Sequence, residues 1–248
     1  MPVNQVYKAT GEKIIDISDS TVTAADLAQN VTAYDASGAK ITGTMQGGLE
    51  MNVKFTSGNK KIPAYMFYNN HGSGSSSTSY PIEEVVIGDG ITSIDNYAFK
   101  NCGSLTSVAI GNGVTNIYKN AFDGCYRLTS IAIPDSVTSI GDWAFQNCTS
   151  LTSVTIGSGI TSIGSSTFLK CTSLTSIAIP DNVTNIDGTA FGDCTNLTSV
   201  AIGSGITTIA FNAFRRCDNL TSITIDKPQD SVSNAPWGAS NATIVWTG

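Results

Sequence analysis

The chain has 248 residues, a formal net charge of −6 and only 13% charged side chains. A nucleic-acid partner needs a basic face, so this sparse and acidic charge argues against one. No apolar run approaches the roughly 18 residues of a membrane span, so none is predicted. Residues 1–8 lack the basic and apolar regions of a secretory signal, which leaves export without a signal, or a chain already processed.

Residues 1–48 do not share the periodicity of the rest of the chain. Residues 23–26 have the form of a capped helix start, which predicts a short helix over 24–30. Residues 31–34 and 39–42, joined by Asp-Ala-Ser-Gly, predict a β-hairpin. Fewer than 50 residues with few large apolar side chains make a marginal core. We therefore expect a small α+β appendage that docks on the next part of the chain, on a copy of itself or on a larger assembly.

From about residue 49 to residue 225 the sequence repeats every 23 residues. Phe precedes each cysteine of the repeat by three residues, and Leu follows it by three. The cysteines that mark the period are Cys102, Cys125, Cys148, Cys171, Cys194 and Cys217. A fixed period of this length is typical of a solenoid, in which one repeat cannot bury its apolar face alone and must stack on its neighbours.

The first repeat is atypical. Residues 62–70 align with residues 94–102 at an offset of 32, nine more than the period. The Gly/Ser-rich segment 71–79 accounts for the extra nine and has the composition of a flexible insertion. Asn70 stands where later repeats have cysteine, as terminal repeats are expected to deviate.

Each repeat predicts two short strands and one helical turn. Residues 105–110 are β-branched and partly alternating, which favours a strand, and Gly or Pro follows it as a turn residue. Residues 114–117 predict a second, shorter strand. The Ala-Phe-x-x-Cys stretch is too short for a stable isolated helix, so we expect a single helical turn held by its neighbours.

The cysteine column allows two interpretations. Successive coils would place equivalent Cα atoms about 4.8 Å apart, which is within the range of a disulfide. However, the six side chains would all point into the core beside the Phe column, where free cysteine behaves as a small hydrophobe. The column therefore predicts a ladder of buried free thiols.

Residues 226–248 break the period and contain Trp237 and Trp246. A solenoid leaves its last apolar layer and a sheet edge exposed, so an irregular terminal cap is physically required. We assign both tryptophans to this cap, with ligand binding as the alternative.

The repeated pattern, best seen from Leu128 to Cys148, resembles the BspA-like bacterial leucine-rich repeats over roughly residues 50–225. This resemblance implies a leucine-rich-repeat solenoid with a parallel sheet on one face and no shared catalytic residues. Members of that family are typically secreted or cell-surface proteins that act by adhesion and protein binding. Residues 15–44 are similar to a segment of phage tail and other virion structural proteins, and residues 235–246 look similar to the ends of such repeat proteins.

The sequence offers little for catalysis or metal binding. His71 is the only histidine and lies in the Gly/Ser insertion, so a His-based triad or metal site is not expected. The cysteines include no CxxC pair. The acidic residues of the repeats, among them Asp95, Asp123, Asp142, Asp187 and Asp193, are predicted to form a solvated face. We expect no enzyme activity and no cofactor.

Two surfaces are candidates for binding. The outward positions of the main strands are Thr, Ser and Ala, so that face is either inert or meets something equally repetitive, such as a glycan or another sheet. The residue types that vary between repeats lie instead on a rim beside the helical turn. This candidate binding rim contains Tyr97, Tyr118, Tyr126, Arg127, Trp143, Phe211, Arg215 and Arg216. Aromatic and arginine side chains on a rigid scaffold favour recognition, whereas packing between coils is the alternative.

The sequence thus predicts a non-enzymatic interaction or adhesion module, extracellular or at a bacterial cell surface. Its partner would be a protein or glycan target on a host or cell surface. The alternative is a structural component of a phage tail or similar assembly, located in a virion, with residues 1–48 for docking or self-association.

Overall fold

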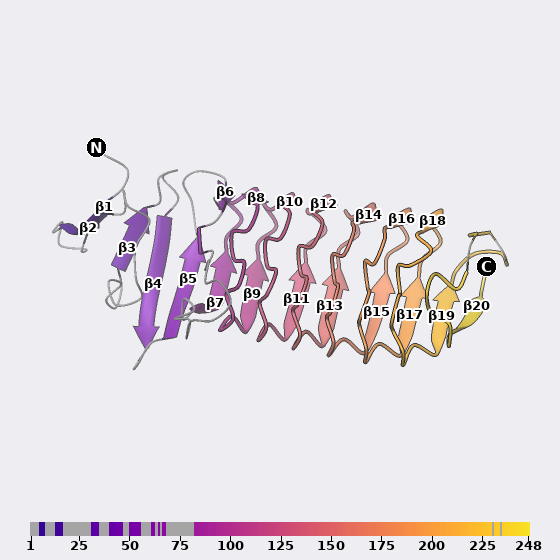
Figure 1. The fold of residues 1–248 in the computed structure, drawn as a ribbon. Coiled ribbons are helices and arrows are strands. Elements are labelled where there is room, and N and C mark those ends of the chain that lie inside the picture. The colour runs from indigo at the N-terminus through magenta and orange to yellow at the C-terminus, as the bar shows by residue number, and fades with distance from the viewer. Residues whose placement is uncertain are drawn as a thin grey trace.

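The computed structural model describes residues 5–7, 13–16, 31–34, 40–46, 50–55, 61–62, 64, 66–67, 82–229, 231–233 and 235–248. These residues form a parallel β-solenoid of about seven stacked coils, which confirms the predicted fold class (Figure 1). The described residues contain strands and turns but no helix.

Each coil contributes one main strand and one short strand, and equivalent strands stack side by side. The main strands are β5 (Glu50–Phe55), β7 (Ile82–Ile87), β9 (Ser107–Ile110), β11 (Ser130–Ile133), β13 (Ser153–Ile156), β15 (Ser176–Ile179), β17 (Ser199–Ile202) and β19 (Ser222–Ile225). The short strands are β6 (Lys61–Ile62), β8 (Ser93–Ile94), β10 (Asn116–Ile117), β12 (Ser139–Ile140), β14 (Ser162–Ile163), β16 (Asn185–Ile186) and β18 (Thr208–Ile209). Paired residues such as Ile131 and Val154 differ by one period, so the repeat sets the register.

The core is a set of stacked columns. Phe67, Phe99, Phe122, Phe145, Phe168, Phe191 and Phe214 form a continuous stack with ring centroids 5.1–5.5 Å apart. Phe67 is the first ring, and Ile62 pairs with Ile94, so the predicted alignment of the atypical first coil is confirmed. The six cysteines lie beside this stack as buried free thiols, as predicted.

The predicted helical turn is wrong. The segment from a short strand to the next main strand, which we call the turn segment, is a run of turns in every complete coil. In residues 97–102, the N–H groups of Ala98, Lys100 and Cys102 donate to the carbonyl three residues earlier. Those of Tyr97, Phe99 and Asn101 donate instead to the next coil, at 2.7–3.0 Å. Left-handed backbone at Tyr97 and Asn101, both with φ of 60°, produces this alternation and prevents a helix.

An aspartate caps the backbone of the following coil at every second junction between coils. The Asp135 carboxylate accepts a hydrogen bond from the Ser158 N–H at 2.7 Å. Two coils earlier and two coils later, Asp89 and Asp181 accept the equivalent bonds from the N–H groups of Asn112 and Ser204. In the receiving coil a Cβ at Gly159 would collide with the Asp135 carbonyl oxygen. Glycine is therefore required there by the close approach of the preceding backbone.

Proline interrupts the main sheet at regular places. Gly111 and Gly203, directly after β9 and β17, donate their N–H groups to the preceding coil. Pro134 and Pro180 occupy the same place after β11 and β15 and have no N–H to donate. The sheet is interrupted between β9 and β11 and between β13 and β15, where these donors are missing.

At the N-terminal end, strands β1 (Gln5–Tyr7), β2 (Lys13–Asp16), β3 (Val31–Tyr34) and β4 (Lys40–Gln46) extend the main sheet. β3 and β4 pair antiparallel, as the predicted hairpin requires. β4 pairs antiparallel with β5, which pairs in parallel with β7, so one sheet crosses the predicted boundary at residue 48. The helix predicted over residues 24–30 and the insertion 71–79 lie outside the described residues.

At the C-terminal end, strand β20 (Thr243–Trp246) pairs in parallel with β19 and takes the place of a further coil (Figure 1). Trp237 is fully buried, and its indole N–H donates to the Ser233 carbonyl at 2.7 Å. Trp246 is half-buried against the core. The buried position of Trp237 supports its assignment to the cap and leaves no surface for a ligand.

Candidate functional site

The outer face of the main sheet is uniform. From β9 to β17 its exposed side chains are Ser107, Ala109, Ser130, Ala132, Ser153, Thr155, Ser176, Ala178, Ser199 and Ala201. Threonines that directly precede these strands use their hydroxyls internally. Thr152 and Thr198, for example, donate to the threonine carbonyl of the preceding coil at 3.0 and 2.9 Å. From β9 to β17 this face therefore offers small hydroxyls and methyl groups and no charge, whereas β7 exposes Glu84 and Val86.

The candidate rim divides between different parts of each coil. Tyr118 follows the short strand β10 directly, whereas Tyr126 and Arg127 lie where the turn segment leads into β11. Tyr118, Tyr126 and Phe211 are exposed by 41, 48 and 73%, which is high for aromatic side chains. Arg127 is exposed as well. The rim is therefore not one patch but two separate corners of the coil.

Two of the predicted rim aromatics are partly covered. The Lys119 ammonium lies 4.6 Å from the centre of the Trp143 ring, and Lys100 lies 5.4 Å from that of Tyr97. Tyr97 and Trp143 are half-buried and occupy equivalent left-handed positions of the turn segment. For these two residues the contacts favour packing, because a cation over the ring occupies the face that a partner would use.

Phe211, Arg215 and Arg216 lie together in one turn segment at the C-terminal end. The two arginines are exposed, and Arg216 pairs with Asp193 at 3.2 Å. The Arg216 side chain remains 66% exposed in this pair. This segment is the most exposed combination of an aromatic ring and positive charge among the predicted rim residues.

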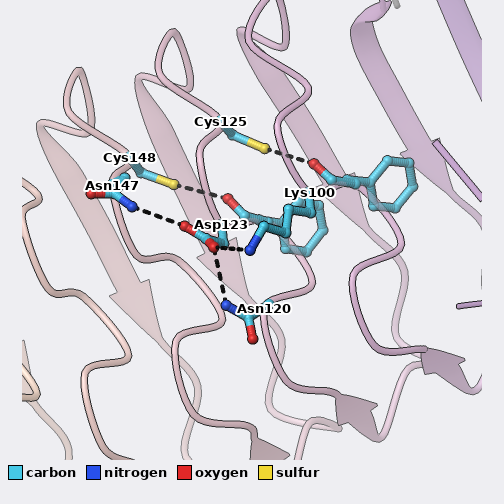
Figure 2. A network of polar contacts seen from close by, with 8 residues as sticks. Lys100, Asn120, Asp123, Cys125, Asn147 and Cys148 are labelled. Atoms are coloured by element: carbon cyan, nitrogen blue, oxygen red, sulfur yellow. Dashed lines mark hydrogen bonds and ion pairs between the residues drawn. The ribbon is translucent and has the colours of Figure 1, made fainter. Parts of the chain in front are cut away.

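A polar network in the first complete coils was missed by the sequence analysis (Figure 2). The prediction of a solvated acidic face is wrong for Asp123, which is only 5% exposed. Its carboxylate contacts the Lys100 ammonium at 2.9 Å and accepts hydrogen bonds from the amides of Asn120 and Asn147, each at 3.0 Å. The available signal was the spacing, because Lys100 and Asp123 are opposite charges one period apart.

The buried thiols are unsuited to chemistry. Each donates to the carbonyl oxygen of a phenylalanine in the preceding coil, at 3.0–3.7 Å. Burial raises the pKa of Cys102, Cys125, Cys148 and Cys171 above the ordinary value of 9.0. A thiol with a raised pKa and no access to solvent is a poor nucleophile.

The described residues contain neither a metal-binding cluster nor a membrane-crossing helix. They bring together no group of three or more His, Cys, Asp or Glu side chains that could hold a metal ion. His71 lies outside the part of the chain that the structure describes. That part contains no helix with the length and hydropathy for a membrane crossing.

Comparison with known proteins agrees with this architecture. The family model "BspA type Leucine rich repeat region (6 copies)" matches residues 72–198 and 115–241. These matches cover more than half of the chain, which therefore belongs to the BspA type leucine-rich repeat family. No curated protein matches the chain.

Among solved structures, the T. pallidum leucine-rich repeat protein TpLRR is similar, with 27% identity and a TM-score of 0.56. The match covers 70% of this chain and 77% of that chain. A leucine-rich cell surface protein from Faecalibacterium prausnitzii has 19% identity and a TM-score of 0.42, over 81% of this chain and 96% of that chain. The pneumococcal vaccine antigen PcpA has 13% identity and a TM-score of 0.41, over 89% of each chain. Proteins of this repeat family are generally surface-exposed interaction modules and generally not enzymes.

Proposed function

We propose that the chain is a non-enzymatic interaction module that binds a protein or glycan target on a host or cell surface. Its location would then be extracellular or at the bacterial cell surface. The observation that carries this proposal is the contrast between a uniform sheet face and exposed aromatic and arginine side chains at two corners of a rigid coil. Such side chains dominate the binding energy of many protein interfaces.

The exposed pair Phe211 and Arg215 is the best first target for a test. Both side chains point away from the core, so Phe211→Ala with Arg215→Ala should leave the fold intact. The labelled full-length protein would be applied to a glycan array and to immobilised extracellular matrix proteins. We expect saturable binding to at least one probe and a loss of more than about tenfold in affinity for the double variant.

A matched control changes the uniform face, with Ser153→Ala and Ser176→Ala. These substitutions remove two exposed hydroxyls from main strands β13 and β15. Binding that falls in the control but not in the Phe211 variant would move the site from the rim to the sheet. No saturable binding to any probe would contradict the proposal.

The second candidate is a structural component of a phage tail or similar virion assembly. It is favoured by the N-terminal strands, which continue the main sheet beyond β5 and could carry docking or self-association through residues 1–48. Light scattering after size-exclusion, on the full chain and on residues 49–248, tests it. An oligomer that dissociates on truncation supports the structural role, and a monomer in both cases supports the interaction module. Circular dichroism must accompany the test, because truncation leaves β5 as a sheet edge.

A further inference from the structure

The Asp123 network joins an amine and two amides to one buried carboxylate. Lys100 comes from one coil, Asn120 and Asp123 from the next, and Asn147 from the coil after (Figure 2). The Lys100 ammonium nitrogen and the Asn120 amide nitrogen both contact the same atom, Asp123 Oδ2, at 2.9 and 3.0 Å. Lys100 Nζ and Asn120 Nδ2 are therefore separated by no more than these two contact distances combined.

The solenoid does not need this network. In later coils the position of Asp123 holds Gln146, Leu169 and Gly192, and that of Asn120 holds Trp143, Ser166 and Thr189. The same turn segment thus forms without a buried charge. A buried ion pair is also weak evidence for stability, because desolvation opposes its attraction. Stability of the fold alone therefore does not explain why these four polar side chains are brought together.

We propose that Lys100 and Asn120 react to form an intramolecular isopeptide bond, with Asp123 as the proton carrier. The Asp123 carboxylate first accepts a proton from the Lys100 ammonium, which leaves a neutral amine and a neutral acid in contact. The Lys100 nitrogen then attacks the side-chain carbonyl carbon of Asn120. Lysine amines act as nucleophiles in this way when a neighbouring group removes their proton.

The reaction balances without a co-reactant. A bond forms between Lys100 Nζ and Asn120 Cγ, and the bond between Asn120 Cγ and Nδ2 breaks. Asp123 protonates the departing nitrogen, accepts the remaining proton of the attacking nitrogen and passes it to the released ammonia, so that ammonium leaves and the carboxylate is regenerated. Nothing is oxidised or reduced.

Burial and position favour this step over the same reaction in water. The side chain of Asp123 is 7% exposed and that of Lys100 is 23% exposed. Water is thus largely kept from the carboxylate, and both side chains are held on one carboxylate oxygen, which lowers the entropic barrier to their encounter. Asn120 is the acceptor because it shares Oδ2 with Lys100, whereas Asn147 contacts the other oxygen, Oδ1.

The bond would connect two neighbouring coils covalently, where otherwise hydrogen bonds and side-chain packing hold them. The crosslink closes the segment between residues 100 and 120. It would prevent the first complete coil from separating from the second when the chain is pulled or partly unfolded.

Mass spectrometry of the full-length protein tests the proposal directly. After purification and several days of folded incubation at neutral pH, we expect an intact mass below that of the sequence by one ammonia. Trypsin should then fail to cut after Lys100 and should release residues 62–119 joined to residues 120–127 as one branched peptide. Succinimide formation also releases ammonia but leaves the cut after Lys100 intact, so the branched peptide is decisive.

Three variants complete the test. Lys100→Arg keeps the positive charge but removes the nucleophile, and Asp123→Asn removes the proton carrier, so both should keep the full mass. Lys119→Arg changes a neighbouring lysine outside the network and should still lose ammonia. Because the wild-type result needs no variant to fold, a full wild-type mass with normal cutting after Lys100 would overturn the proposal. A branched peptide that joins Lys100 to Asp123 or Asn147 would overturn the assignment of Asn120.

Discussion

Replacing one ring in the phenylalanine stack should measure how much ring contacts contribute to the solenoid. Phe145 lies in the middle, with ring centroids 5.3 and 5.5 Å from its two neighbours. Phe214 lies at the end and has one ring neighbour within the stack, at 5.5 Å. Both side chains are fully buried, so Phe→Leu removes the same apolar surface at each position.

The difference between the two variants isolates one ring contact. A stacked aromatic pair contributes about 0.5–1.5 kcal/mol beyond the burial of its surface. Phe145→Leu loses two such contacts and Phe214→Leu loses one. We therefore expect Phe145→Leu to lower the free energy of unfolding by about 0.5–1.5 kcal/mol more than Phe214→Leu.

Urea unfolding, followed by both circular dichroism and tryptophan fluorescence, measures this difference. The two probes must give one transition, because repeat proteins can lose cooperativity and then have no single free energy of unfolding. Equal losses for the two variants, within error and at unchanged m-values, would refute the reasoning. The stack would then act only as buried apolar surface.

Three further predictions follow from the packing. Gly159→Ala should destabilise the fold by about 1–3 kcal/mol or more, because its Cβ would meet the Asp135 carbonyl and lie 2.6 Å from the Val137 carbonyl oxygen. Gly188→Ala is the matched control for thermal melting, since its Cβ meets only the flexible end of Asn212. The six thiols should remain unreactive toward a thiol reagent in the folded protein and should all titrate in denaturant without reductant; fewer than six would indicate a disulfide. The pKa values of the folded thiols lie above the ordinary 9.0, so above that pH the unfolded chain loses thiol protons more readily than the folded chain. The thiols therefore contribute their full share to the free energy of unfolding below about pH 9, and this share falls as the pH rises further. Urea midpoints measured across this range should fall less steeply in Cys148→Ala, and an unchanged slope would contradict the role of the thiols.

The sequence predicts the register of the fold because residues one period apart lie side by side in neighbouring coils. Residues 23 apart pair in the parallel ladder, so the Phe and Cys columns follow directly from counting. The alignment of Phe67 with Phe99 succeeded across a nine-residue insertion for the same reason. Only the stacking requirement was needed to place these side chains in the core.

The local conformation of the turn segment could not be predicted in the same way. Ala-Phe-x-x-Cys matches a helical turn, but the neighbouring coil competes for the same N–H groups. Left-handed backbone falls on Tyr97, Trp143 and Ser166, which have no special preference for it. Asn101, Asn147 and Asp193 are left-handed as well and do favour this conformation, so the sequence contains part of the signal. Contacts between coils impose the rest.

The Asp123 network escaped prediction because it depends on three coils at once. Its four residues look unrelated in the sequence, and acidic residues in loops are usually solvated. In a solenoid, however, each residue lies next to the residues one period before and after it in the sequence. Lys100 lies one period before Asp123, so the two side chains are neighbours and form an ion pair.

This geometry also limits where function can arise. An inward residue touches its equivalents in the coils on both sides, so a change there disturbs several layers, as the Phe stack illustrates. From β9 to β17 the outward main-strand positions hardly vary, which leaves the turn segment and its flanking corners as the variable surface of these coils. Tyr126, Phe211 and Arg215 project from these places into solvent, while Asp123 at an equivalent place is buried by its partners. The same positions can therefore serve recognition where their side chains are free of neighbours, and crosslinking where neighbouring coils enclose them.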